Sequence, residues 1–350
     1  ILASYAVPHY EVGERVFLEE EDKERFPFQR DRDRIIHTQA FRRLKHKTQV
    51  FVVGQGDHYR TRITHTFEVA QISRDLARAL GCNEDLAEAI ALAHDLGHTP
   101  FGHAGEETMN ACLQPFGLSF EHNLQSIRIV SLLEDRCSLY RGLNLSREIL
   151  EGLWKHRTPF DTPTSEILRS PSIEAQIVNL ADEIAYTAHD TDDGLRAGFF
   201  TSQELSSLSL CERAQEKAKK KGTELRGAIV DILVTDVIAS TLHTIEKQKI
   251  LTLEDVYVAQ FPIALFSEDI KNSTKELRTF LWDRLYQHPD VLREAGKGQR
   301  AIEALFTQYM KNPPLKVQEL MRRNTSSLPE AVKDYIAGMT DTFAFSQTSS

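Results

Sequence analysis

A histidine and an aspartate stand side by side at His94-Asp95, and His98, His103 and Glu106 follow within one short stretch. A neutral imidazole nitrogen and a carboxylate oxygen together suit a borderline or hard divalent cation. Imidazoles and a carboxylate gathered beside a metal are also the groups that metal-assisted hydrolysis uses. Because an adjacent His-Asp pair is common by chance, the weight of this interpretation depends on what else the chain brings to it.

His65 upstream and Asp182 downstream are the residues that complete such a site. With His94 and Asp95 they would give a mononuclear centre of two imidazoles and two carboxylates, with positions left for water or phosphate oxygens. Taken singly, His65 is equally well explained as a core histidine bonded to a backbone carbonyl, and Asp182 as half of a buried ion pair. All four fall on inward-facing helical positions, which favours the joint interpretation as a metal site.

The elements that must position these residues are helices, because apolar residues recur at helical spacing and Gly and Pro fall between the periodic segments. One helix follows Thr64 and ends at Gly81, and Asn83 is the predicted N-cap of the next. That next helix ends at His94-Asp95, where Gly97 and Pro100 open a loop. The predicted core positions of the two helices are Val69, Ile72, Leu76 and Ala79, then Leu86, Ile90 and Ala93.

A helix over 172–191 carries Asp182. Its predicted core stripe is Ile173, Ile177, Leu180, Ile184 and Ala188, and its second stripe is Asp182, Tyr186, Asp190 and Asp193. Like charges at this spacing repel unless something cationic lies opposite. Further helices are predicted over 102–113 and 121–133, a connector or exposed helix over 202–227, and long helices over 228–310 before Pro313-Pro314.

Composition indicates a soluble globular protein with a substantial core. The 350 residues are 41% hydrophobic and 27% charged, and no apolar run reaches the length of about 18 residues that a membrane span needs. The apolar start, Ile1 to Val7, is too short for a signal peptide. Four cysteines without a CxxC pair disfavour a disulfide framework and predict a reducing, cytoplasmic location.

The net charge of −9 argues against a general nucleic-acid coating protein. A basic zone between Arg30 and Arg62 nevertheless predicts a focused polyanion site, with a solvated helix face in salt bridges as the alternative. A second basic run, Lys217 to Lys221, suggests single-stranded DNA binding, although a solvated charge run explains it better. The basic residues of the first zone are Arg30, Arg32, Arg34, Arg42, Arg43, Lys45, Lys47, Arg60 and Arg62.

Extended motifs around these residues resemble those of the HD-domain deoxynucleoside triphosphate triphosphohydrolases, the bacterial dGTPase-like proteins. They are TRITH at 61–65, HDLGHTPFGHAGE at 94–106, EHN at 121–123 and ADEIAY at 181–186, preceded by RDRDRIIH at 30–37 and FRRLKHKTQVF at 41–51. The resemblance is dense from residue 30 to 193. It implies an all-α HD-domain helical bundle with additional C-terminal helices, divided into an N-terminal extension (1–29), an HD core (30–200) and a C-terminal helical region packed on the core (201–350).

The resemblance also implies a role for individual residues. His65, His94, Asp95 and Asp182 match the metal ligands, and His98, His103, Glu106 and His122 match the catalytic group. Gln49 and Asp190 match residues that bind the sugar 3′-hydroxyl, and Tyr186 matches a residue that packs on the deoxyribose. Val50 matches an apolar residue that helps exclude a 2′-hydroxyl. Arg62 matches a residue that contacts the α-phosphate. Glu183 stands where the related vertebrate SAM-and-HD-domain dNTPase has a phosphate-binding lysine. Lys155 and His156 are therefore candidates to supply the missing cation.

The implied reaction is metal-dependent hydrolysis of a dNTP at the α-phosphate, giving a deoxynucleoside and tripolyphosphate. The divalent metal is Mg, Mn, Fe, Co or Ni, because such a ligand set is permissive. The resemblance further implies a homo-oligomer, a tetramer or hexamer, and a second dNTP as activator. The alternatives are another HD-domain phosphohydrolase, either a nucleotidase or a phosphodiesterase, and a nucleotide sensor that does not hydrolyse.

Overall fold

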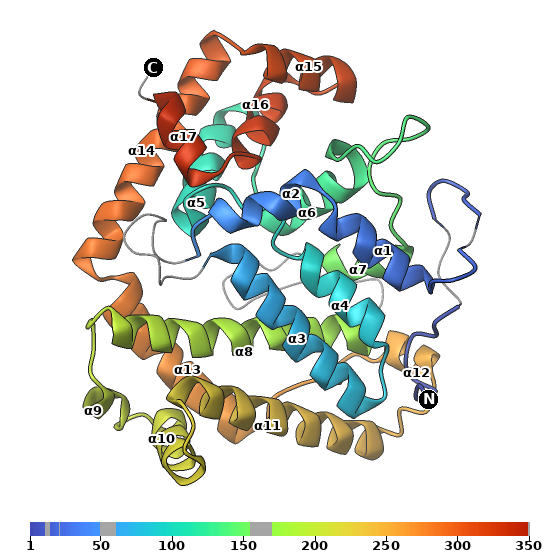
Figure 1. The fold of residues 1–350 in the computed structure, drawn as a ribbon, viewed down its shortest axis with the longest axis vertical. Coiled ribbons are helices and arrows are strands. Elements are labelled where there is room, and N and C mark those ends of the chain that lie inside the picture. The colour runs from blue at the N-terminus through green and yellow to red at the C-terminus, as the bar shows by residue number, and fades with distance from the viewer. Residues whose placement is uncertain (11–14, 21, 50–60, 155–169, 349–350) are drawn as a thin grey trace.

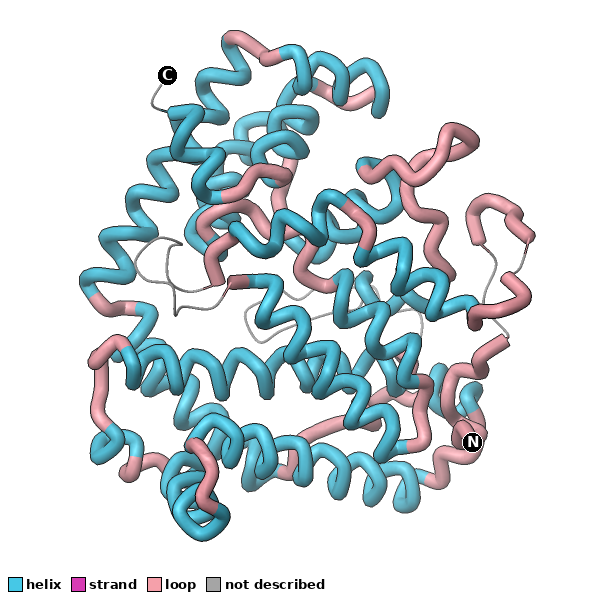
Figure 2. The backbone as a smooth tube through the Cα atoms, in the orientation of Figure 1, coloured by secondary structure: helices cyan, strands magenta, loops and turns pink. Residues whose placement is uncertain are grey.

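The structure, a computed structural model, describes residues 1–350 except 11–14, 21, 50–60, 155–169 and 349–350. The described part is built from α-helices, with short 3₁₀ or π turns and two isolated β-bridges, which confirms the predicted all-α class (Figure 2). The helices are α1 (Pro27–Ile36), α2 (Gln39–Arg43), α3 (Arg62–Leu80), α4 (Glu84–Ala93), α5 (Gly102–Leu113), α6 (His122–Arg128), α7 (Arg147–Trp154), α8 (Ile173–Arg196), α9 (Ser202–Leu205), α10 (Ser209–Lys221), α11 (Leu225–Gln248), α12 (Leu253–Val258), α13 (Glu268–Leu281), α14 (Pro289–Lys311), α15 (Leu315–Asn324), α16 (Leu328–Ala337) and α17 (Asp341–Thr348).

The centre of the molecule is a bundle in which α3 packs against both α4 and α8 (Figure 1). Helix α1 covers α4 on one side, and α11 lies along α8 and α3 on the other. The predicted helix boundaries around α3 and α4 are confirmed, because Gly81 ends α3 in the left-handed region at φ 68° and the Asn83 side chain accepts from Leu86 N–H. One predicted core position is wrong: Ala79 is exposed, and Ala77 faces the core instead.

Helix α8 carries the predicted acidic stripe and lies in the central bundle. The Ser172 hydroxyl caps its N-terminus by accepting from Ala175 N–H. Both predicted stripes lie against neighbouring helices, so that Asp182, Tyr186 and Asp190 are buried along with the apolar residues. A buried carboxylate requires partners, and α3 on one face and α13 on another supply them.

The C-terminal helices form a second hydrophobic cluster around α14. This helix packs against α5, α16 and α17, and its Ile302 and Leu305 meet Met109 and Leu113 of α5. Phe101, in the loop between α4 and α5, belongs to this second cluster and not to the main core. The C-terminal helices are therefore packed directly on the segment that carries the His98 to Glu106 motif.

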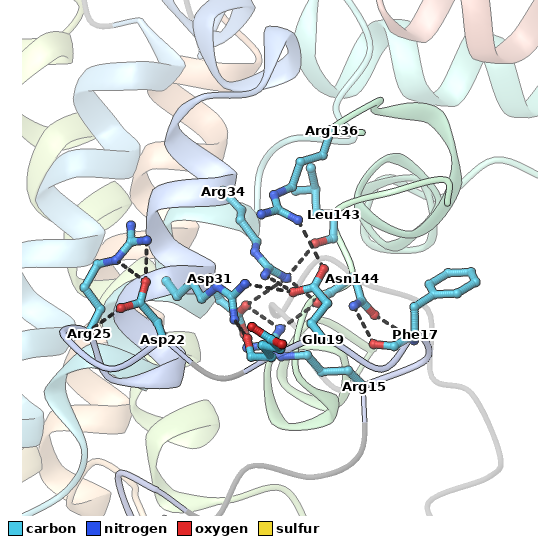
Figure 3. Close-up of polar contacts among 12 residues, drawn as sticks. Arg15, Phe17, Glu19, Asp22, Arg25, Asp31, Arg34, Arg136, Leu143 and Asn144 are labelled. Carbon is cyan, nitrogen blue, oxygen red and sulfur yellow. Dashed lines mark hydrogen bonds and ion pairs between the residues drawn. The ribbon is translucent and has the colours of Figure 1, made fainter. Parts of the chain in front are cut away.

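An ionic network ties the N-terminal segment to α1 and to the loop before α7 (Figure 3). Arg15 binds Asp31 at 2.6 Å, and Arg34 donates to the carbonyl oxygens of Leu143 and Asn144 and pairs with Glu19. These partners are fixed parts of the fold. For α1, the alternative of a salt-bridged helix face therefore describes the basic zone better than a polyanion site does.

Helix α11 is the one described helix whose length and composition would allow it to cross a membrane. Only 28% of its most apolar window is buried, yet it packs on α8 and α10. Core helices of soluble proteins pass the same test, so this feature is weak evidence for a membrane span.

Candidate metal centre and adjoining histidines

The four predicted metal ligands come from three helices of the central bundle and are all buried. His65 lies in the first turn of α3, His94 caps the C-terminus of α4 with Asp95 next to it, and Asp182 lies in the middle of α8. Because α3 packs between α4 and α8, residues far apart in sequence meet at one point. The structure thus brings together the four residues that the sequence singled out.

Their side-chain atoms converge at the distances expected of a cation site. His65 Nε2 lies 2.9 Å from Asp182 Oδ1, and His94 Nε2 lies 3.3 Å from Asp95 Oδ1 and 3.8 Å from Asp182 Oδ1. The ligand atoms of His65, His94 and Asp95 all lie within 4.8 Å of one another. His94 Nδ1 lies 2.6 Å from Ala91 O, a hydrogen bond that fixes the tautomer with the Nε2 lone pair turned toward the carboxylates. Two imidazoles and two carboxylates so arranged fit a divalent metal ion.

The electrostatics of the centre keep the Asp95 carboxylate charged. Burial alone would raise the pKa of Asp95, but His94, Arg62 and His98 hold it well below its usual range. Burial opposes protonation of His65, yet the facing Asp182 carboxylate raises the pKa of this histidine overall. A proton and a divalent cation therefore compete for the same place between His65 and Asp182.

A second group of side chains adjoins the first. The Nδ1 of His122 lies 3.0 Å from both carboxylate oxygens of Glu106, and the His122 backbone N–H donates to the same carboxylate at 2.9 Å. The His98 ring stacks on the His122 ring at 3.9 Å between centroids. His98 Nε2 also lies 3.2 Å from Asp95 Oδ1, so His98 links the two groups.

The histidines of this second group differ in exposure, and burial affects their protonation. Burial, then Arg62 and His122, lowers the pKa of His98 well below its usual range, so His98 is neutral at neutral pH. Burial would raise the pKa of Glu106, but His122 and the neighbouring histidines lower it, which keeps Glu106 ionised. His103 stands at the rim, with 59% of its side chain exposed and Nδ1 3.9 Å from Glu106. A neutral His98 stacked on a His122 that contacts a carboxylate places two imidazoles in different environments, as a divided acid and base role requires.

The predicted sugar-binding residues fall into three cases. Gln49 is half-buried, and its Oε1 is a buried acceptor with no hydrogen-bond partner among the described residues, as a ligand-binding atom would be. Tyr186 and Asp190 lie one turn apart on α8, and Asp190 accepts a hydrogen bond from the Tyr286 hydroxyl. Val50 lies outside the described residues.

Of the predicted phosphate contacts, Arg62 reaches the metal centre. It is almost completely buried, and its Nη1 donates to Asp95 Oδ2 at 3.0 Å, while its Nε has no hydrogen-bond partner. Lys155 and His156 lie outside the described residues. Glu183 has a different cationic neighbour from the two that the sequence suggested: its carboxylate forms an ion pair with Arg278 of α13.

Arg278 and Tyr286 are the residues that the sequence analysis missed. Each meets an acidic residue of α8 from a helix nearly a hundred positions later in the chain. Neither belongs to a recognisable motif. The acidic stripe on α8 includes Asp190 and so predicted a donor such as Tyr286, without saying where in the chain it arises. Glu183 lies outside that stripe, so no such signal pointed to Arg278.

A cavity of about 700 Å³ is lined by Lys47 and by residues of α2 and of the C-terminal helices. Arg42, Arg43, Lys316 and Arg323 are among its lining residues, together with Glu134 and Asp334. It contains none of the predicted metal ligands. The chemistry-bearing cluster is defined by convergent side chains and not by this cavity.

Comparison with known families agrees with the fold and the cluster. Residues 62–187 match the HD domain, and residues 264–350 match the phosphohydrolase-associated domain. The first match spans His65, His94, Asp95 and Asp182. The helical bundle and its His/Asp cluster define an HD-domain protein, a class of metal-dependent phosphohydrolases.

Curated relatives narrow the class to a family. The chain is 45% identical to the deoxyguanosinetriphosphate triphosphohydrolase-like protein of Geobacter sulfurreducens over 363 aligned residues, covering 99% of this chain and 94% of that protein. It is 46% identical to the protein of the same name from Azoarcus sp. strain BH72, over 99% of this chain and 95% of that protein. The chain belongs to the family of deoxyguanosinetriphosphate triphosphohydrolase-like proteins, as its motifs predicted.

Proposed function

We propose that this protein hydrolyses deoxynucleoside triphosphates at the α-phosphate, releasing a deoxynucleoside and tripolyphosphate. The observation that carries the proposal is the direct junction of two groups, the His65/His94/Asp95/Asp182 cluster and the His98/Glu106/His122 group, through the contact of His98 with Asp95. One group suits a cation and the other suits proton transfer. A phosphoester placed between them would meet both.

His65, His94, Asp95 and Asp182 would hold the divalent metal, which is Mg, Mn, Fe, Co or Ni. When bound, such an ion withdraws charge from a phosphate oxygen and lowers the pKa of water. The ion pair of Arg62 with Asp95 already presents a guanidinium at this point, and its forked donors suit a phosphate oxygen.

Proton transfer would fall to the stacked histidines. Glu106 binds His122 at Nδ1, which leaves Nε2 directed away from the carboxylate and stabilises the imidazolium form. His122 could then donate a proton to the leaving 5′-oxygen, while neutral His98 stays available as an acceptor. His103 at the exposed rim would approach the scissile bond from the solvent side.

The deoxyribose would lie along the α8 stripe. Tyr186 and Asp190 face this region, the buried acceptor of Gln49 is available for a hydroxyl, and Val50 would help to exclude a 2′-hydroxyl. Arg278 pairs with Glu183, the position for which the sequence offered Lys155 and His156 as replacement cations. We propose that Arg278 neutralises part of the triphosphate charge.

A second candidate activity is phosphodiester hydrolysis by a two-metal centre. His98, Glu106 and His122 are themselves close enough to hold a cation, which favours this alternative. Metal analysis separates the two: about one ion per chain supports the mononuclear triphosphohydrolase, and two tightly bound transition metals support the diesterase. A nucleotide sensor, the third alternative, would bind dNTP without turnover.

The test supplies each of the four dNTPs, with GTP as control, in Mg and then in Mn, singly and as a mixture. Products are separated by ion exchange. Tripolyphosphate from dNTPs, with GTP untouched, supports the proposal, and pyrophosphate or orthophosphate contradicts it. In the His122→Ala variant, turnover should fall by about 10² to 10⁴ while nucleotide affinity stays near that of the wild type.

The remaining properties extend the same proposal. Composition and cysteine usage predict a soluble, cytoplasmic protein. The resemblance predicts a homo-oligomer, tetramer or hexamer, and a dNTP activator, which the four-dNTP mixture tests. Single-stranded DNA binding through Lys217 to Lys221 stays a weaker prediction, because Lys217 and Lys221 both pair with Asp231. The boundaries at 29/30 and 200/201 also stay predictions.

A further inference from the structure

The segment 96–101 connects the two chemical groups and is held at both of its ends. It starts beside Asp95, carries His98, and leads into α5 with His103 and Glu106. Its first half rests on α6: Gly97 N–H donates to Ser126 Oγ at 2.9 Å, and that hydroxyl donates to His94 O at 2.8 Å. This half is thus fixed by the central bundle.

The second half is fixed by the C-terminal helices. Phe101 has φ 66°, a left-handed conformation that costs a non-glycine residue roughly 1–2 kcal/mol. Its backbone N–H donates to Asp341 Oδ1 at 3.0 Å. The other oxygen of Asp341 accepts from the Thr48 N–H at 2.9 Å and from the Thr48 hydroxyl. Asp341 is 1% exposed, so these three donors supply the hydrogen bonds that water would give to an exposed carboxylate.

Two further contacts hold the same half of the segment. The Phe101 ring lies 4.6 Å from the Phe345 ring, and a Cβ placed on Gly298 would come within 2.5 Å of it. Lys47 Nζ donates to the carbonyl oxygens of His98 at 2.5 Å and of Ala337 at 2.9 Å. A strained turn persists only where its surroundings over-determine it, and here α14, α16 and α17 do so.

We propose that Asp341 is a positioning residue for the reaction. By holding the left-handed turn at Phe101 it fixes where His98 stands relative to Glu106 and His122. This inference rests on the proposed function of the His98 group. It assigns the C-terminal helices a part in catalysis, since they set the geometry of a loop whose chemistry lies entirely in the HD region.

The physical reason is that catalytic side chains such as His98 and His122 work only when their positions are accurate. In Asp341→Asn one of the two acceptor oxygens is replaced by an NH₂ donor, so the Phe101 N–H and the two Thr48 donors can no longer all be bonded, and the turn can relax toward the right-handed region. The stacked pair of His98 and His122 would then shift. A displacement of about 1 Å in such a group lowers the reaction rate on the order of 100-fold. None of the four proposed metal ligands lies within the segment, so metal binding should be unaffected.

The experiment compares Asp341→Asn and Gly298→Ala with Val332→Ala in the full chain. The first two disturb the turn by different means. The third removes buried volume from the same C-terminal cluster and leaves the hydrogen bonds of Asp341 and Lys47 and the Phe101–Phe345 ring contact in place. The expected result is a fall in kcat of about tenfold or more for the first two, with KM and metal content unchanged, and an unchanged kcat for Val332→Ala. Hydrogen exchange of the peptide covering 96–101 should rise in Asp341→Asn and not in Val332→Ala.

Three outcomes would overturn the inference: a normal kcat in both turn variants, an equal loss in Val332→Ala, or unchanged exchange in Asp341→Asn. Failure of the proposed function has a separate signature, namely no dNTP turnover by the wild type. The exchange measurement needs no substrate, so it judges the anchoring of the turn in that case as well.

Discussion

Lys47 is a buried lysine whose charge state should leave a measurable mark on stability. Only 2% of it is exposed, and its Nζ donates to His98 O and Ala337 O. Burial, then the positive charges of Arg43 and Arg62, lowers its pKa from an ordinary 10.5 to about 7. A neutral amine keeps two N–H donors, which is the number that the two carbonyls need.

The sign and size of the effect follow from proton linkage. Between about pH 7 and 10.5 the unfolded chain binds a proton at Lys47 that the folded chain does not, so stability rises with pH in this window. The slope is about 1.4 kcal/mol per pH unit. From about pH 7.5 to about pH 9 the contribution is therefore about 2 kcal/mol.

The assay is denaturant unfolding of chelator-treated protein at several pH values across that range. Lys47→Met keeps the length of the side chain and removes its titration, so the wild-type protein should gain about 2 kcal/mol relative to this variant as the pH rises. Lys45→Met, at an exposed position two residues earlier, is the matched control and should follow the wild type. A wild-type to Lys47→Met difference that stays constant with pH would refute the reasoning, because the ammonium would then be charged in the folded state.

Three further perturbations test other parts of the site. Asp95→Asn should abolish metal retention and lower kcat by more than about 10⁴, measured by metal analysis and turnover, and full metal content would argue against ligation by Asp95. Gly97→Ala places a Cβ 2.0 Å from His122 O, so denaturant unfolding should show a loss of about 2 kcal/mol or more, and a neutral result would contradict the close packing. Tyr286→Phe removes the donor to buried Asp190, so stability should fall by about 2 kcal/mol and KM for dNTP should rise; unchanged values of both would exclude this contact.

The parts of the fold that the sequence predicted are those with local signals. Gly81 and Asn83 mark the junction of α3 and α4 through backbone conformation and capping, which depend on neighbouring residues alone. The metal ligands were found because His94 and Asp95 are adjacent and because His65 and Asp182 fall on apolar helix faces. The error at Ala79 has the same origin, since helical spacing alone does not decide which edge of a stripe the neighbouring helix covers.

The parts that could not be predicted depend on contacts between distant segments. Lys47 bonds Ala337 and Asp341 bonds Thr48 across almost three hundred positions in the chain, and both also hold segment 96–101. No pattern of spacing reveals such pairs. The left-handed turn at Phe101 was equally hidden, because an aromatic residue gives no sign of that conformation. Arg278 was missed for the same reason, since its partner Glu183 signals only that some cation is needed.

The most direct test is hydrolysis of a dNTP in ¹⁸O-labelled water. The products are separated, and the ¹⁸O content of each is measured by mass spectrometry. Attack of water on the α-phosphorus with departure of the 5′-oxygen places one label in tripolyphosphate and none in the deoxynucleoside. That is the predicted result. Label in the deoxynucleoside, or in pyrophosphate or orthophosphate, would mean that another bond is broken and would contradict the assignment of the site.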